Sequence, residues 1–237
     1  MVNIKALMQA LDGGYVARPE EMLRYFLSEI MELWGMKPWN PAPSKLKQQV
    51  VDAIGEYDRA LSAHPAFYDL LGPLYMELAN QGGRAKLGQF FTPWSIAAMM
   101  AAMQSPPASS EDERLLTAID PACGSGVMML ALCSQVLMDH GPAALQSWSV
   151  SGIDLDPICS RMMAVQLIAN CAHHQLKLGE IAVYEGNALG SPSDLSVVAH
   201  ATATRETKVL PAEHPIRKQM ALDAAKPHFE QLKLFAA

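Results

Sequence analysis

From Leu115 onward, short apolar segments alternate with longer segments that have the length of helices. The short segments read LLTAID, WSVSGID and EIAVYEGN, and the longer ones between them read VMMLALCSQVLMDH and PICSRMMAVQLIANCAHH. Short strands separated by helices are typical of βαβ units, whose strands lie parallel in one sheet. We therefore predict an α/β fold in which a ligand binds at the carboxyl ends of the strands.

The residues before this alternation are expected to be helical. Apolar side chains recur at helical spacing in two stretches, at Met22, Leu23, Phe26, Ile30 and Leu33 and at Leu46, Val50, Ile54, Tyr57 and Leu61. The polar stretch SPPASSEDER, residues 105–114, predicts a surface loop. We place a helical domain at residues 1–86, an α/β domain at 87–200 and a C-terminal extension at 201–237.

The bulk composition limits the classes of protein to which the chain can belong. With 237 residues, half of them apolar, it is long enough to bury a core, and neither a membrane span nor an export signal is evident. We expect a cytoplasmic protein. Residues 91–200 contain three Lys or Arg against ten Asp or Glu, whereas 201–237 contain six against four, so any contact with DNA is expected to avoid the acidic middle.

The sequence contains four cysteines, Cys123, Cys133, Cys159 and Cys171. They form no CxxC pair and lie mostly in segments that read as buried helix, which favours reduced thiols. Cys171 is close to His173 and His174, but a metal site needs a second pair of ligands, and this cluster is more typical of a helix end. We predict no metal.

A glycine-rich turn follows the first predicted strand. That strand ends at Asp120, and the chain continues through Gly124-Ser125-Gly126 into a helix. Glycine allows a tight turn that brings backbone amides close to a ligand. The dinucleotide pattern GxGxxG lacks its third glycine, because Met129 occupies that position. The turn therefore predicts a nucleotide-type ligand but not hydride transfer.

Two aspartates follow the second predicted strand, in the stretch GIDLDP. A carboxylate at this position can bind the two hydroxyls of a ribose. Asp156, directly before Pro157, suits the N-cap of the next helix. We assign the ribose to Asp154 and the cap to Asp156, with the alternative that capping explains this stretch entirely.

Two weaker signals flank these motifs. Asn187 follows the third predicted strand, and its amide can both donate and accept hydrogen bonds, as an adenine edge requires, although alone it would indicate only a turn. Upstream, in FFTP, Thr92 suits an N-cap and Pro93 a first helical position, so this motif alone indicates only the start of a helix.

Taken in order, GQFFTP, DPACGSG, GIDLDP and EGNAL closely resemble the cofactor half of adenine-N6 DNA methyltransferases, particularly the modification subunits of type I restriction systems. The resemblance covers about residues 86–190. It implies a partial Rossmann-like fold that binds S-adenosylmethionine, behind an N-terminal helical domain, with DNA as the partner. The cofactor-binding positions that it implies are Phe90, Thr92, Asp120, Ala122, Gly124, Gly126, Asp154, Leu155 and Asn187. Phe90 and Thr92 would close over the ligand, Asp154 would take the ribose and Asn187 the adenine. The methionine end would be lined by Asp120, Ala122, Gly124 and Gly126.

The chain departs from this family at the catalytic loop. The family uses an (Asn/Asp)-Pro-Pro-aromatic loop after its fourth strand, which accepts the amine protons of a flipped adenine and stacks on the base. No such loop follows Asn187, although DLSVVAH, residues 194–200, is expected to add a fourth strand. The near matches SPPA at 105–108 and NPAP at 40–43 precede the cofactor motifs and lack an aromatic residue or an adjacent second proline.

Two hypotheses about function remain open at this point. The first is a DNA adenine methyltransferase, or its cofactor-binding subunit, whose missing catalytic loop comes from a partner chain. The second is a catalytically silent relative that engages the machinery of DNA replication or restriction. The intact cofactor motifs favour the first hypothesis, and the absent loop favours the second.

The end of the chain carries a separate signal, the pentapeptide QLKLF. Gln231, Leu232, Leu234 and Phe235 resemble the peptide with which many bacterial DNA-processing proteins bind the sliding clamp. Leu234 and Phe235 would fill an apolar pocket, and the Gln231 amide would fix the register. The alternative is a terminal helix that packs Leu232 and Phe235 on the domain.

Overall fold

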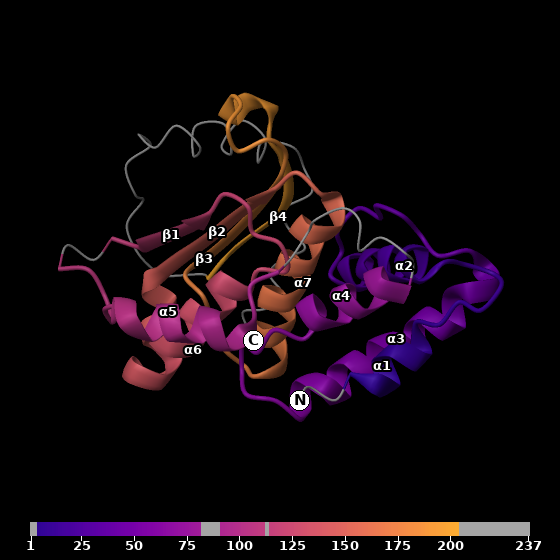
Figure 1. Cartoon of the computed structure of the whole chain (residues 1–237). Helices are drawn as coiled ribbons and strands as arrows, with labels where there is room; N and C mark the ends of the chain where they lie inside the picture. Colours follow the sequence, from indigo (N-terminus) through magenta and orange to yellow (C-terminus); the bar gives the residue numbers. More distant parts are fainter. Residues whose placement is uncertain (1–3, 82–90, 112–113, 204–237) are drawn as a thin grey trace.

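The computed structural model describes residues 4–81, 91–111 and 114–203, which form a group of helices beside a four-stranded sheet (Figure 1). The helices are α1 (Lys5–Ala10), α2 (Pro19–Leu33), α3 (Ser44–Ser62), α4 (Leu71–Gln81), α5 (Trp94–Gln104), α6 (Val127–His140) and α7 (Pro157–His173), with short 3-10 turns η2 (Ala144–Ser147) and η3 (Pro192–Asp194). The strands are β1 (Leu116–Asp120), β2 (Trp148–Asp154), β3 (Glu180–Glu185) and β4 (Ser196–Thr202). The predicted α/β fold is confirmed.

The sheet has the order β1-β2-β3-β4, and the first three strands are parallel, as the alternation of segments predicts. The expected fourth strand is present, but it runs antiparallel to β3. The reason lies in the connection, residues 186–195, which contains only the short turn η3. A parallel crossover needs roughly a dozen or more residues and usually a helix, so this short link returns the chain in the opposite direction.

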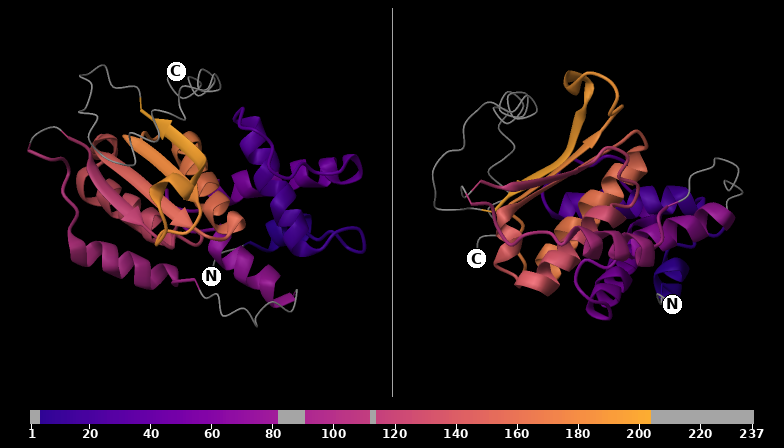
Figure 2. Two further views of the ribbon diagram at one scale, coloured as in Figure 1. Left: turned by 90° about the horizontal axis from the view of Figure 1, so that it is seen from above. Right: turned by 60° about the vertical axis from the view of Figure 1, so that its left-hand side comes forward.

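Helices α6 and α7 pack together against one face of the sheet (Figure 2). Val150, Ile181 and Val183 of the strands share a core with side chains of these two helices. The opposite face of the sheet carries a smaller cluster around Ile153 and Tyr184. The sheet is therefore covered by helices on one face within the described part of the chain.

The helices α1 to α4 form an N-terminal group that packs on α7 (Figure 1), which confirms the predicted helical start of the chain. One continuous core joins residues of α2 such as Phe26 to Met162 and Val165 of α7. Because α7 contacts the N-terminal helices as well as the sheet, it is buried almost all round. Leu33 is the last residue of α2, and its side chain is 69% exposed.

The four cysteines are free thiols, as expected, and three of them are buried. Burial raises the thiol pKa of Cys171 to about 12. His173, two residues after Cys171, contacts α3, where its Nδ1 lies 2.8 Å from Asp58 Oδ1.

The stretch 105–111 is a surface loop, as predicted. No helix in the described ranges is long and apolar enough to cross a membrane.

Candidate functional site

The carboxyl ends of β1, β2 and β3 meet at one edge of the sheet. Register pairs Asp120 with Gly152, and Asp154 with Glu185. Backbone hydrogen bonds continue this alignment beyond the strands. The Cys123 amide donates to the Ile153 carbonyl at 3.0 Å, and the Gly186 amide donates to the Asp154 carbonyl at 2.9 Å. The loops that follow the three strands therefore form one continuous surface.

The glycine loop makes the tight turn that its sequence predicts. Gly124 and Gly126 have φ values of 52° and 89°, in the left-handed region that favours glycine. Gly126 is also the N-cap of α6, and a Cβ on it would lie 2.7 Å from Met163 Cγ. Glycine is thus required there both by conformation and by the close approach of α7.

Asp154 links the end of β2 to the glycine loop. Its Oδ2 accepts a hydrogen bond from the Gly124 amide at 2.8 Å, and its Oδ1 accepts one from the Asp156 amide at 2.8 Å. Each carboxylate oxygen has a second lone pair, so the half-buried group can still accept two hydroxyl donors. Asp156 caps α7 by accepting a hydrogen bond from the Ile158 amide at 2.8 Å, which confirms its predicted role.

Asp120 adds a second carboxyl group to this edge. Burial raises its pKa, its hydrogen bond from the Ala122 amide lowers it, and the charge of Asp154 raises it further. Two neighbouring carboxyl groups favour a ligand that carries positive charge. The Ala122 amide donates to Asp120 Oδ1 at 3.0 Å, and this hydrogen bond fixes the main chain of Ala122 within the loop.

The aromatic residue that lies on the loop is Phe91. A Cβ on Gly124 would lie 3.2 Å from the Phe91 ring, and that ring stacks on Tyr75 of α4 with centroids 5.2 Å apart. Phe90, the aromatic residue predicted to contact the ligand, lies outside the described residues. The two phenylalanines are adjacent, and nothing in the pattern FFTP distinguishes them.

Thr92 directly precedes the turn into α5, and its interpretation as an N-cap is wrong. The N-cap of α5 is Pro93, which has an extended ψ of 143°, and no side chain caps the helix. The helix begins one residue later than expected because Pro93 continues the extended segment instead of opening the first turn. The role of Thr92 toward a ligand stays a prediction.

Asn187 and Leu155 complete the predicted set. Asn187 Oδ1 accepts a hydrogen bond from the Leu189 amide at 3.0 Å, so the side chain closes a local turn. Leu155 follows Asp154, and its side chain is 74% exposed. Both residues lie at the strand-end surface, and their contacts with an adenine or other ligand stay predictions.

A buried carboxyl group that no sequence motif indicates lies behind the glycine loop. Asp69, only 2% exposed, accepts a hydrogen bond from Ser125 Oγ at 3.0 Å. Gln166 of α7 donates to the Ser125 carbonyl at 2.9 Å. A possible signal was the stretch FYDLLG, in which a single charged residue stands among apolar ones shortly before a helix.

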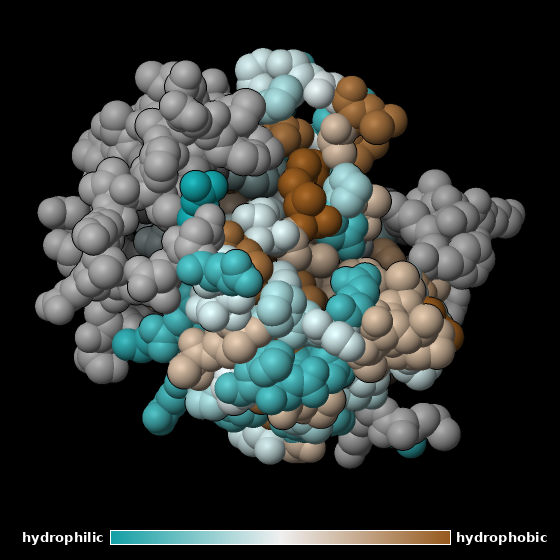
Figure 3. All heavy atoms as spheres, turned by 90° about the vertical axis from the view of Figure 1, so that its left-hand side faces the viewer, coloured by the Kyte–Doolittle hydropathy of each residue, from teal (hydrophilic) through white to brown (hydrophobic). Residues whose placement is uncertain are grey.

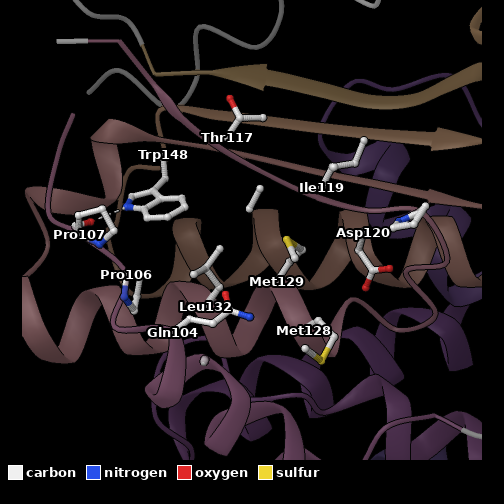
Figure 4. A pocket seen from close by; sticks show the side chains of 13 residues that line it. Gln104, Pro106, Pro107, Thr117, Ile119, Asp120, Met128, Met129, Leu132 and Trp148 are labelled. Carbon is white, nitrogen blue, oxygen red and sulfur yellow. Dashed lines mark hydrogen bonds between the residues drawn. The ribbon is translucent and has the colours of Figure 1, made fainter. Parts of the chain in front are cut away.

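A groove of about 520 Å³ runs along β1, between this strand and the helices α5 and α6 (Figure 4). Trp148 lies at one end, where its Nε1 donates to the Pro107 carbonyl at 3.2 Å, and Asp120 lies at the other end. The groove includes only Asp120 of the predicted cofactor residues.

The strand β1 lies at an edge of the sheet, because within the described residues it pairs only with β2. The surface on this side of the molecule mixes apolar and polar side chains (Figure 3).

The described residues form an α/β fold with a glycine loop and two aspartates, Asp120 and Asp154, at its strand ends. The chain matches the model of the N-6 DNA Methylase family over residues 67–221, which is more than half of its length. It therefore belongs to the N-6 DNA methylase family. Membership of this family implies S-adenosylmethionine as the cofactor.

Comparison with solved structures gives a more distant neighbour. A Listeria monocytogenes protein, described as a class I S-adenosylmethionine-dependent methyltransferase, matches with a TM-score of 0.45 and 13% sequence identity. The match covers 79% of this chain and 54% of that chain, so the present chain spans about half the length of this neighbour. No curated protein matches the sequence.

Proposed function

We propose that this chain binds S-adenosylmethionine at the carboxyl ends of β1, β2 and β3 and serves N6-adenine methylation of DNA. The observation that supports this proposal best is the hydrogen bond between the Gly124 amide and Asp154 Oδ2. It brings a carboxylate suited to a ribose directly against a loop suited to the rest of a nucleoside.

The residues at this edge fit the cofactor. Asp154 has lone pairs left for two hydroxyls, and the carboxyl groups of Asp120 and Asp154 suit a ligand with a positive sulfonium group. Gly124 and Gly126 give the loop its tight turn, because both have left-handed φ values. When bound, S-adenosylmethionine supplies an activated methyl group.

Each side chain of the site then has a proposed task. Asp154 orients the ribose, Asn187 meets the adenine edge with its amide, and the exposed Leu155 covers an apolar face of the nucleoside. Asp120 and the loop at Ala122 line the methionine end. Thr92 belongs to the segment that closes over the ligand, together with Phe90.

Methyl transfer itself requires acceptors for the protons of the adenine amine. The sequence contains neither Asn-Pro-Pro nor Asp-Pro-Pro, so the family's catalytic loop is missing from this chain. We propose that a partner subunit contributes it, as in a restriction-modification enzyme that is divided between chains. The unpaired edge of β1 supports an incomplete sheet, within the described part of the chain.

A second candidate function is a catalytically silent methyltransferase relative that acts as a binding module. The same missing loop favours it. The Asp154 carboxyl group beside the glycine loop favours cofactor binding in either case, because two of its lone pairs stay available for a ligand.

One experiment separates these functions. The full chain is titrated with S-adenosylmethionine in a calorimeter and then incubated with unmethylated DNA and radiolabelled cofactor. The proposal predicts that the chain binds S-adenosylmethionine. Methyl transfer to DNA is expected only when cell extract or a co-expressed second protein supplies the partner subunit. Transfer by the chain alone would exclude the need for a partner, and binding without transfer under every condition would support the silent module.

The C-terminal pentapeptide adds a proposed partner. Residues 231–235 lie outside the described residues, so the resemblance of their sequence alone supports binding to a bacterial sliding clamp. Such binding would bring the chain to newly replicated DNA under both candidate functions.

A further inference from the structure

A buried polar cluster connects the glycine loop to the N-terminal helices. Its members are Asp69, Ser125, Gln166 and Asn170, and none of them is more than 2% exposed. They come from three parts of the chain, namely the turn before α4, the glycine loop and α7. Buried polar groups need partners, so the contacts within this cluster fix how these three parts meet.

Asp69 is the centre of the cluster. Its Oδ1 accepts hydrogen bonds from the Gly72 amide at 2.9 Å and from Gln166 Nε2 at 2.8 Å, while its Oδ2 accepts one from Ser125 Oγ at 3.0 Å. Three donors compensate for the burial of this carboxyl group. One of the three belongs to the loop at the proposed cofactor site.

Gln166 holds the same loop residue from α7. Its Nε2 donates to the Ser125 carbonyl at 2.9 Å as well as to Asp69, and its Oε1 accepts from the Leu70 and Leu71 amides at 2.8 and 3.0 Å. Ser125 is thus held through both its main chain and its side chain.

The close approach of the two segments depends on Gly72. A Cβ at this position would lie 2.3 Å from Asp69 Oδ2 and 2.8 Å from Ser125 Oγ. No side chain larger than that of glycine fits between these atoms without displacing one of them. The sequence therefore keeps the start of α4 small where it meets the loop.

We propose that Asp69 is a positioning residue, which fixes the glycine loop through Ser125 and thereby sets the affinity of the strand-end site for S-adenosylmethionine. Ser125 stands between two glycines with left-handed φ values, and such a segment has many alternative conformations when it is not anchored. A loop that is already ordered loses less entropy when a ligand binds. This inference rests on the proposed function.

The test uses four single variants of the full chain and the double variant of Ser125→Ala with Asp69→Ala. Ser125→Ala removes only the Oγ hydrogen bond, and Asp69→Ala removes the carboxyl group. Asp69→Asn keeps an oxygen for Gly72 and Gln166, and its amide can donate to Ser125 Oγ. Ser160→Ala is the matched control, because Ser160 is a fully buried serine whose hydroxyl donates to carbonyls at the start of α7, those of Pro157 at 3.3 Å and the N-cap Asp156 at 3.5 Å.

We expect the Kd for S-adenosylmethionine to rise about tenfold in Ser125→Ala, in Asp69→Ala and, without further increase, in the double variant. Asp69→Asn and Ser160→Ala should stay within about twofold of the original chain. A role in stability alone would lower the urea midpoint of Ser125→Ala and leave the Kd of the folded protein unchanged, which would overturn the proposal. If Asp69→Ala does not fold, Ser125→Ala and Asp69→Asn decide the question.

Hydrogen exchange without ligand separates this inference from the proposed function. The amides of residues 123–127 should exchange faster in Ser125→Ala than in the original chain and in Ser160→Ala. If the original chain binds no S-adenosylmethionine, the proposed function fails, and the claim about affinity fails with it. Faster exchange would then still show that Asp69 anchors the loop, whereas equal exchange rates would overturn the inference altogether.

Discussion

Asp154, at the end of β2, accepts a hydrogen bond from the Gly124 amide in the loop that follows β1, and its Oδ2 lies 2.8 Å from the amide nitrogen. One carboxyl group thus shapes the glycine loop and also faces the position proposed for a ribose. The side chain of Asp156, two residues later, caps α7. The two aspartates therefore provide a matched pair for experiment.

Replacing Asp154 with Ala should weaken binding of S-adenosylmethionine roughly 10-fold to 100-fold, because the ribose contact and the support of Gly124 are lost together. Asp156→Ala should cost about 1 kcal/mol of stability through the lost cap while leaving the Kd nearly unchanged. Calorimetry and urea unfolding of both variants check this pair. Equal affinities in the two variants would exclude the assigned role of Asp154.

Two glycine substitutions should change stability in opposite directions. Gly124→Ala forces a left-handed residue and a Cβ 3.2 Å from the Phe91 ring, so it should destabilise the fold by about 1–2 kcal/mol. Gly55→Ala lies within α3 with no atom near the added Cβ, and it should stabilise the fold by about 0.5–1 kcal/mol. Urea midpoints that shift in the same direction would contradict the described loop conformation.

The buried carboxyl group of Asp69 should make stability depend on pH. Burial raises the pKa of Asp69 above its ordinary value of 3.8, and this effect outweighs its hydrogen bonds from Gln166, Gly72 and Ser125. The folded chain then holds a proton that the unfolded chain has released, so this contribution to stability is lost as pH rises from the ordinary value through the folded pKa.

Asp69→Asn removes that titration, and unfolding free energies of both chains at several pH values check it. The stability of the original chain relative to Asp69→Asn should fall as pH rises through this window and stay constant above it. A difference that is independent of pH, or one that grows with pH, would show that burial does not raise this pKa.

Much of the fold follows from local pattern. The alternation after Leu115 predicts three parallel strands, and the Asp-Pro step at Asp156 predicts the start of α7, because hydrophobic period and capping depend on neighbouring residues. The direction of β4 does not follow in this way, since it depends on how the link after Gly186 folds rather than on the strand's own residues.

The candidate site is only partly predictable for a related reason. Motifs at the strand ends identify Asp120, Asp154 and the glycines as neighbours, and the structure brings them together. The contact of Asp69 with Gln166 joins residues 97 positions apart, and no local pattern reports it. Long-range packing of the N-terminal helices on α7 creates that contact.

For the C-terminal pentapeptide, we expect the full chain to be retained on immobilised bacterial sliding clamp. Phe235→Ala should abolish retention, because it removes the proposed pocket anchor, whereas Lys233→Ala at the variable position should not change it. Equal retention of all three proteins would exclude this peptide as the contact.

The most direct measurement is hydrogen exchange of the full chain with and without S-adenosylmethionine. If successive strand ends hold the cofactor, added ligand should slow exchange in peptides covering residues 120–127, 154–158 and 185–190, and Asp154→Ala should reduce this protection. Absence of protection at saturating ligand, or protection confined to the groove beside Trp148, would contradict the account.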